Sequence, residues 1–298
     1  MTVRKITHTR LPTSVASNLR FLNQLEEAYR LQANLIESEP VDMTALPTVE
    51  LPGAFVAEAR QLRAILTEVL DLPLPLEMLH HAIDGFSPAR RAHSAVMARK
   101  SSLLQPLTDP ARAVPLAEAY DALVCTLLAP YLSECMPDLE RIYYATFPTI
   151  RVQTPSSSIA TIRPHIDGIY GLQAGSLNIW LPLTEVEEVS ALWVESSVGS
   201  TNFCPITRPT RFDGRRRVHF TIPNRSRMTR VSLDFRVVPG GGFDPASRLA
   251  QMGYFSAASL VRADHGGAEG ADCRWVKTMS GHISELHGLP HTGKPTRH

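Results

Sequence analysis

Cysteine is scarce in this chain of 298 residues: its four cysteines, Cys125, Cys135, Cys204 and Cys273, include no pair with C-x-x-C spacing. The sequence therefore lacks the pattern of a zinc site or of a disulfide framework. An excess of one charge is also absent, because 30 Lys and Arg against 29 Asp and Glu give a net charge of +1. That balance does not favour nucleic acid or a membrane surface as a partner.

Long apolar segments are missing as well. The N-terminal ten residues contain no apolar core of a signal peptide, and we expect no run long enough to span a membrane. We therefore expect a cytoplasmic protein with reduced cysteines. With 44% hydrophobic residues, a chain of this length can bury a substantial core, and we expect residues 1–298 to form one domain.

Helical and strand-like patterns occupy different parts of the chain. Helical spacing of apolar residues predicts helices over 13–37, 53–70 and 116–135, the last with a possible kink at Pro130. After Pro137 the pattern changes to short, partly alternating runs, which predict strands. Helices followed by many strands indicate an α+β fold in which helices cover the outer face of paired antiparallel sheets. The predicted strands are residues 141–146, 150–153, 158–163, 176–183, 191–196, 218–222 and 229–238, with one more near 253–255.

His165 and Asp167 are the first candidates for chemistry. On an extended strand a His-x-Asp pair projects to one face, where an imidazole nitrogen and a carboxylate oxygen can share a metal ion. His219, 54 residues further on (219 − 165), supplies a third ligand. Two His and one carboxylate form the facial triad of non-haem Fe(II) oxygenases, which leaves positions open for a co-substrate and O2. Without a metal, the same three residues would be polar groups on strand faces.

Arg230 and Ser232 are the candidates for holding a co-substrate. Turn residues after His219 suggest a hairpin, with His219 on its first strand and Arg230 on its second. A guanidinium binds a carboxylate in bidentate fashion, and Ser232 on the same face adds a hydroxyl donor. Arg236 shares that face, but we prefer Arg230 because Arg236 would lie roughly 20 Å further along the strand.

Several blocks of the chain together resemble a known family, the 2-oxoglutarate/Fe(II) dioxygenases of the phytanoyl-CoA dioxygenase-like superfamily. Within that superfamily, the chain is most similar to the StrG-like proteins of streptomycin and related aminoglycoside biosynthesis. The blocks lie between residues 141 and 239 and cover roughly a third of the chain. They are FPTIRVQTP (147–155), HIDGIY (165–170), GSLNIWLPLT (175–184), LWVES (192–196), FDG (212–214), His219 and TRVSLDFR (229–236).

The resemblance implies a double-stranded β-helix, the jelly-roll or cupin-like core, that uses Fe(II), 2-oxoglutarate and O2. In this division of the chain, residues 1–137 are a mainly helical part, 138–260 the jelly-roll core and 261–298 a C-terminal extension. The sequence departs from the family around the distal histidine, where Arg215–Arg217 and Phe220 replace a small or polar run. The arginines are expected to form a solvated loop.

The remaining candidates have open alternatives. Asn178 would contact 2-oxoglutarate or a metal-bound water, or bond within the fold. Arg151, Gln153, Tyr170 and Glu195 would line a pocket for a small polar substrate, or serve the structure only. Arg151 would suit a carboxylate and Glu195 an amine. Trp180 and Trp193 are expected in the core.

The expected function is oxidation of a small polar metabolite, such as an amino acid or aminocyclitol, in antibiotic biosynthesis. Hydroxylation, desaturation and ring closure are not distinguished by the sequence. One alternative is a cupin-type metal enzyme that does not use 2-oxoglutarate. Another is a non-catalytic jelly-roll binding module.

Overall fold

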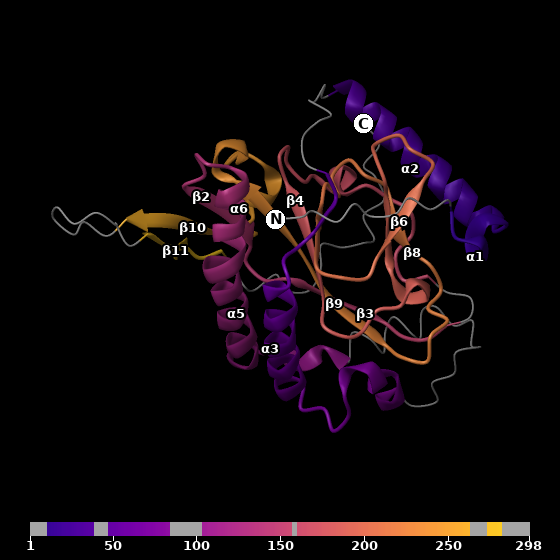
Figure 1. The fold of residues 1–298 in the computed structure, drawn as a ribbon, viewed down its shortest axis with the longest axis horizontal. Helices are drawn as coiled ribbons and strands as arrows, with labels where there is room; N and C mark the ends of the chain where they lie inside the picture. The colour runs from indigo at the N-terminus through magenta and orange to yellow at the C-terminus, as the bar shows by residue number, and fades with distance from the viewer. Residues whose placement is uncertain (1–10, 39–46, 84–102, 157–159, 263–272, 282–298) are drawn as a thin grey trace.

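Two antiparallel sheets form the centre of the protein in the computed structural model (Figure 1), which describes residues 11–38, 47–83, 103–156, 160–262 and 273–281. The large sheet has the order β1-β7-β4-β9-β2-β10-β11, with β3 also paired to β9. The small sheet has the order β6-β5-β8. The strands of the large sheet are β1 (Val49–Glu50), β2 (Arg141–Ala145), β3 (Thr149–Gln153), β4 (Leu177–Pro182), β7 (Thr210–Phe212), β9 (Arg230–Pro239), β10 (Phe255–Arg262) and β11 (Cys273–Met279). Those of the small sheet are β5 (Leu192–Glu195), β6 (Phe203–Ile206) and β8 (His219–Thr221).

Helices cover the outer face of each sheet. Helix α3 (Ala54–Val69) and the run α5 (Pro110–Leu123), η3 (Val124–Leu128) and α6 (Ala129–Cys135) pack on the large sheet, and their apolar residues share one core with it. Helices α1 (Thr13–Ala16) and α2 (Leu19–Ser38) pack on the small sheet through a second core. The predicted mixture of helices with a sheet-rich antiparallel core is confirmed.

The alternation along β9 explains why a polar interior exists between the two sheets. Leu233, Phe235 and Val237 face the helices and belong to the large core. The intervening residues therefore point between the sheets. These residues are Arg230, Ser232, Asp234 and Arg236, all buried. Four polar side chains in a row inside a protein need a function or a dense set of partners.

The hairpin predicted around His219 is wrong. Strand β8, which carries His219, pairs with β5 in the small sheet, whereas β9 pairs with β2, β3 and β4 in the large one. The turn residues after His219 therefore lie in a crossover between sheets. The predicted strand over 158–163 is also wrong in its described part, because residues 160–163 adopt no strand.

The predicted helices fit well, with three differences. The helix expected over 13–37 is divided into α1 and α2, with Ser17 and Asn18 between them. The helix expected to begin at residue 116 begins at Pro110, where Asp109 caps it by accepting a hydrogen bond from the Ala111 backbone N–H at 3.0 Å. Near Pro130 the chain forms the π-helical turn η3. Proline lacks an N–H to donate, and a π-turn is one way to absorb that loss without ending the helix.

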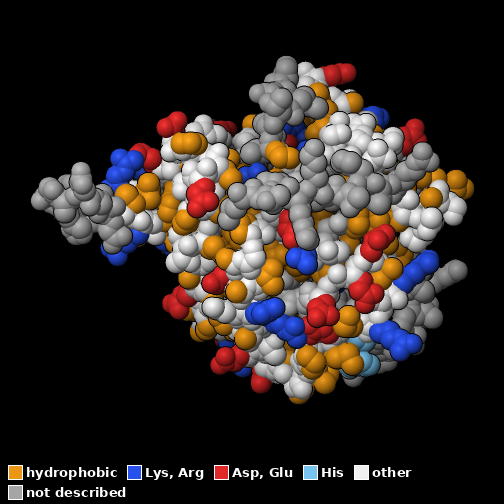
Figure 2. Space-filling model, viewed as in Figure 1, with side chains coloured by type: hydrophobic (Ala, Val, Ile, Leu, Met, Phe, Trp, Pro, Cys, Tyr) orange, Lys and Arg blue, Asp and Glu red, His pale blue; other side chains and the backbone are white. Residues whose placement is uncertain are grey.

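Contrary to the sequence expectation, the run Pro110–Cys135 is long and apolar enough to cross a membrane by length and composition, although such a helix is weak evidence by itself. Here its apolar side chains, including Leu116, Tyr120 and Leu128, are part of the large core. We therefore interpret it as a core helix. On the face of the molecule shown in Figure 2, Lys and Arg side chains are interspersed with Asp and Glu.

Candidate metal centre

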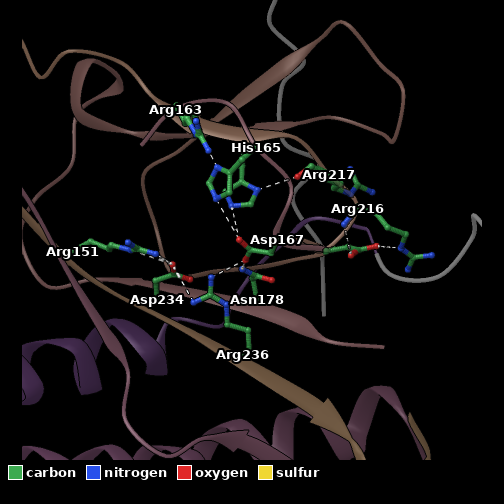
Figure 3. Close-up of polar contacts among 11 residues, drawn as sticks. Arg151, Arg163, His165, Asp167, Asn178, Arg216, Arg217, Asp234 and Arg236 are labelled. Atoms are coloured by element: carbon green, nitrogen blue, oxygen red, sulfur yellow. Dashed lines mark hydrogen bonds and ion pairs between the residues drawn. The ribbon is translucent and has the colours of Figure 1, made fainter. Parts of the chain in front are cut away.

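The three predicted ligands come together between the sheets, and Figure 3 shows His165 and Asp167 pointing toward one another. His165 forms an isolated bridge with His219 of β8, and Asp167 begins the short 3-10 helix η4 (Asp167–Tyr170). One ligand atom from each residue lies within 4.8 Å of the others, and all three residues are buried. The prediction placed Asp167 on an extended strand, and that part of the prediction is wrong. Asp167 nevertheless faces the same point as His165.

Both imidazoles are oriented by backbone carbonyls. The Nδ1 of His165 lies 2.9 Å from the Arg163 carbonyl, and the Nδ1 of His219 lies 3.0 Å from the Arg217 carbonyl. Because a carbonyl oxygen only accepts, each Nδ1 carries a proton, and Nε2 is the nitrogen that faces the cluster. Burial, with the neighbouring His165, lowers the pKa of His219 to about 4, so this imidazole stays neutral. A neutral imidazole whose other nitrogen is held by a carbonyl is the usual state of a metal ligand.

The Asp167 carboxylate is held from both sides. Its Oδ1 lies 3.3 Å from Nε2 of His165 and 3.7 Å from Nε2 of His219. Its Oδ2 accepts hydrogen bonds from Nδ2 of Asn178 at 2.8 Å and from Arg236 at 2.7 Å. Burial raises the pKa of Asp167, but the charge of the neighbouring Arg236 guanidinium outweighs burial and holds that pKa well below its usual range. The carboxylate is therefore ionised.

The turn that contains the three consecutive arginines is structural, which corrects its interpretation as a solvated loop. Arg215 is buried and its Nε donates to the Leu172 carbonyl at 2.7 Å, while Arg216 pairs with Asp213 at 2.6 Å. The same turn holds the metal-ligand segment through its backbone. The Gly214 carbonyl accepts from Asp167 N–H at 2.8 Å, and the Arg215 carbonyl accepts from Gly168 N–H at 3.0 Å.

Arg230 is buried with most of its donors unused. One NH1 donates to the Ser190 carbonyl at 3.2 Å, and the guanidinium carbon lies 5.8 Å from the Trp180 ring centre. Its Nε and NH2, and the Oγ of Ser232, have no partner in the described part of the chain. Burial, followed by the nearby charge of Arg151, lowers the pKa of Arg230 to about 9. A buried cation in this state is unfavourable unless an anion binds it.

Arg236, the alternative to Arg230 as a carboxylate anchor, already pairs with two carboxylates of the protein. One NH2 pairs with Asp167 at 2.7 Å, and its NH1 lies 3.4 Å from Asp234. Asp234 also pairs with Arg151 at 3.1 Å. Arg236 was expected to lie far from the candidate metal ligands, but its side chain forms an ion pair with Asp167. Its position on the inward face of β9 was predictable, whereas its partner was not.

Asn178 and Gln153 lie on the interior side, where they were expected. The Nδ2 of Asn178 is used by Asp167, whereas its Oδ1 has no partner among the described residues. Gln153 sits opposite Arg230 in the β3–β9 pair and donates to the Ile222 carbonyl at 2.7 Å. Its Oε1 also lacks a partner in the described chain.

Of the other predicted pocket residues, Tyr170 and Arg151 lie near the site, whereas Glu195 does not. Tyr170 lies beside the site, with its ring centre 5.7 Å from that of His165. Phe212, which the sequence analysis did not select, lies similarly 5.3 Å from His219. Arg151 is on the inner face but is paired with Asp234.

Glu195 does not lie with the pocket residues, which corrects its predicted position. Val194 is paired with His219, so the next residue along β5 points to the opposite face. There the Glu195 carboxylate accepts from Gln32 of α2 at 2.7 Å and from the Val218 backbone N–H at 2.9 Å. Burial raises the pKa of Glu195 to about 7. Trp193, on the same outer face, is in the core as predicted.

Comparison with known proteins gives one sequence relative and several structural ones. No family model matches the chain. The streptomycin biosynthesis protein StrG of Streptomyces griseus is 28% identical over 111 residues, which are 37% of this chain and 54% of that protein. The chain thus matches about half the length of this curated relative. The predicted similarity to StrG-like proteins is confirmed over that segment.

The structural relatives are distant. The α-ketoglutarate-dependent epimerase SnoN of nogalamycin biosynthesis is 17% identical and 93% of each chain is covered, with a TM-score of 0.33. The α-ketoglutarate-dependent carbocyclase SnoK of the same biosynthesis is 14% identical, with coverage of 84% and 96% and a TM-score of 0.36. The non-haem monooxygenase ThoJ is 13% identical, with coverage of 65% and 73% and a TM-score of 0.34.

Proposed function

We propose that this protein is an Fe(II)- and 2-oxoglutarate-dependent oxygenase that oxidises a small metabolite in antibiotic-type secondary metabolism. The observation that carries the proposal is the buried cluster of His165, Asp167 and His219 beside Arg230, a buried cation with unused donors. The first supplies a metal site with open positions, and the second supplies an anchor for an anion. The match to a streptomycin biosynthesis protein supports the metabolic setting.

The strand order supports a jelly-roll core within this proposal. Strands β3, β9, β4 and β7 are neighbours in the large sheet, and they face β8, β5 and β6, with His165 bridged to β8. Such a pair of facing sheets encloses a site between them. Strand β1 from the N-terminal third pairs with β7, which supports the assignment of residues 1–298 to one domain.

The donor set fits Fe(II). Two imidazoles and one ionised carboxylate can occupy one side of a metal and suit an iron with open positions. When bound, Fe(II) with 2-oxoglutarate and O2 supplies the oxidising chemistry, in which the keto acid is decarboxylated to succinate. The protein contributes orientation and exclusion of water. The Arg163 and Arg217 carbonyls fix the imidazoles, and Asn178 with Arg236 fixes the carboxylate.

Arg230 and Ser232 fit the distal carboxylate of 2-oxoglutarate. The unused Nε and NH2 of Arg230 and the Ser232 hydroxyl lie on the same face of β9. A carboxylate there would neutralise the Arg230 charge and accept from both guanidinium nitrogens and from the Ser232 hydroxyl, and such charge-assisted bidentate bonds are among the stronger ones in proteins. Arg236 suits this role less because carboxylates already occupy it.

For the substrate we retain a small polar metabolite as the proposal, with Gln153 and Tyr170 as candidate contacts. The argument for an amino acid is weaker than the sequence suggested, because Glu195 faces away and Arg151 is paired with Asp234. The match to a streptomycin biosynthesis protein favours an aminocyclitol over an amino acid. Two aromatic rings, Tyr170 and Phe212, lie against the imidazoles, so a ring-containing substrate belongs in any screen.

An anaerobic titration with Fe(II) and 2-oxoglutarate tests this proposal. Chelation of the metal by 2-oxoglutarate should produce a weak visible charge-transfer band. Turnover is then measured as succinate across aminocyclitols, amino acids, aromatic compounds and acyl-CoAs. Iron binding without the band would favour a metal enzyme that does not use 2-oxoglutarate, and no iron binding would favour a binding module.

A further inference from the structure

The two oxygens of the Asp167 carboxylate have different surroundings. Its Oδ1 faces the two imidazole Nε2 atoms at 3.3 and 3.7 Å. Its Oδ2 is occupied by two donors, Asn178 Nδ2 at 2.8 Å and Arg236 NH2 at 2.7 Å (Figure 3). A metal held between the imidazoles would therefore meet only one oxygen with free lone pairs on that side.

From this we propose that Arg236, assisted by Asn178, is a positioning residue that restricts Asp167 to binding the metal through Oδ1 alone. The inference rests on the proposed function, since it assumes a metal at the triad. Its consequence is specific: a carboxylate bound through one oxygen uses one coordination position, whereas a chelating carboxylate uses two. The restriction keeps open a position that a co-substrate and O2 would otherwise have to compete for.

Arg236 is itself held in place, so its contact with Asp167 is well defined. One arm of its guanidinium bonds Asp167 and the other faces Asp234 at 3.4 Å. Asp234 is in turn paired with Arg151 at 3.1 Å. Arg236 is 4% exposed, and its planar fork can address two carboxylates at once. A lysine carries the same charge but not the fork.

Asn178 is fixed by close packing rather than by charge. A Cβ placed on Gly214 would lie 2.5 Å from the Asn178 Cγ, so the backbone at Gly214 rests directly on the amide. The amide has no room to move toward Gly214, and its Nδ2 stays on Oδ2 of Asp167. Two independent restraints therefore act on one oxygen.

Co(II) titration followed by visible absorption tests the inference without relying on activity, because the ligand-field bands of Co(II) depend on its coordination number and geometry. The main variant is Arg236→Lys, and the matched control is Arg230→Lys, the same substitution on the same face of the same strand. We expect Arg236→Lys to weaken Co(II) binding by about 10- to 100-fold, as for other outer partners of metal ligands, and to change the absorption spectrum. The control should bind Co(II) like the wild type.

Asn178→Leu provides a second variant that removes one donor without removing a buried charge, and it keeps the test valid if Arg236→Lys does not fold. It should also change the Co(II) spectrum, with a smaller loss of affinity. Wild-type affinity and spectrum in a folded Arg236→Lys, or in Asn178→Leu, would overturn the inference. If the wild type itself bound no Co(II), the metal site and the proposed function would fail, and the inference with them.

Discussion

His165, Asp167 and His219 each offer one atom to a metal, but the three residues differ in their other contacts. The imidazoles bond backbone carbonyls through Nδ1, whereas the Asp167 carboxylate accepts hydrogen bonds from Asn178 and Arg236. We expect alanine at any of the three positions to abolish succinate formation. His165→Ala and His219→Ala should leave stability nearly unchanged, while Asp167→Ala should cost about 1–3 kcal/mol because it leaves buried donors unsatisfied.

Succinate assays with circular dichroism and urea unfolding measure both effects. Asp167→Asn is the control, since an amide keeps an acceptor for Arg236 and the shape of the side chain. Succinate production retained by all three alanine variants would show that the triad is not the metal site.

Arg230 is our proposed anchor for 2-oxoglutarate, but its buried charge should destabilise the ligand-free protein. In the ligand-free protein its guanidinium is buried with two nitrogens unpaired. We expect Arg230→Met to raise the 2-oxoglutarate requirement by about 10- to 150-fold, equivalent to roughly 1.5–3 kcal/mol, without lowering the ligand-free melting temperature. The Arg236→Met variant should show the reverse pattern: a lower melting temperature, because Asp167 and Asp234 lose a partner, and a smaller effect on 2-oxoglutarate at saturating Fe(II).

Thermal melts with and without 2-oxoglutarate separate these outcomes. We expect 2-oxoglutarate to raise the melting temperature of the wild type but not that of Arg230→Met. If Arg236→Met loses more 2-oxoglutarate affinity than Arg230→Met, then Arg236 is the anchor.

Among the elements, α2 docks on the small sheet next to the strand that carries His219. Phe21 packs edge-on against Phe220 with ring centres 4.9 Å apart, and Gln32 donates to Glu195. Because burial raises the pKa of Glu195 from 4.5 to about 7, the folded protein keeps a proton there that the unfolded chain releases. Stability from this group is therefore fully present below about pH 4.5 and is lost as pH rises toward 7.

We expect this loss to reach about 3 kcal/mol, from a shift of roughly two and a half pH units. Urea unfolding at several pH values, compared between the wild type and Glu195→Gln, isolates the contribution because other groups titrate in both proteins. The difference in unfolding free energy should change between pH 4.5 and 7 and level off above. A constant difference would mean that Glu195 is ionised throughout.

The same elements show where sequence reasoning reached its limits. Strong patterns were sufficient for α3, for β4 and for β9, whose alternation also identified its polar face. Strands of two or three residues, such as β1 and β7, are too short to show a period. Turn residues indicated a reversal after His219, but they do not specify whether the chain returns in the same sheet or crosses to the other. Glu195 was misplaced because its face depends on the pairing of its neighbour Val194 with His219.

For the candidate site, residue types and spacing were sufficient to select the three ligands and Arg230. The contacts that orient these side chains could not be predicted from residue types and spacing. The bonds of Asp167 to Arg236 and of Asp213 to Arg216 depend on how strands and turns stack, which no local pattern encodes. The alternating face of β9 did contain the information that Arg236 points inward.

For the whole molecule, the site lies between two sheets whose outer faces have separate apolar cores. The large core joins α3, α5 and the large sheet, and the second joins α2 and the small sheet. Both cores are built from apolar side chains of helices and strands, so we expect the packing of the described chain not to depend on a metal. This differs from small metal-dependent domains, in which metal binding drives folding.

We therefore expect metal removal to leave the fold intact. After treatment with EDTA the far-ultraviolet circular dichroism should match that of the Fe(II)-loaded protein. Removal of the metal should lower the free energy of unfolding only by the amount that mass action predicts, and the melting temperature should fall accordingly. That amount is about 2.7 kcal/mol at a metal concentration 100 times the dissociation constant. The His219→Ala variant is the control, because its melting temperature should respond much less to Fe(II). Loss of helical and sheet signal on chelation would instead mean that the triad holds the two sheets together.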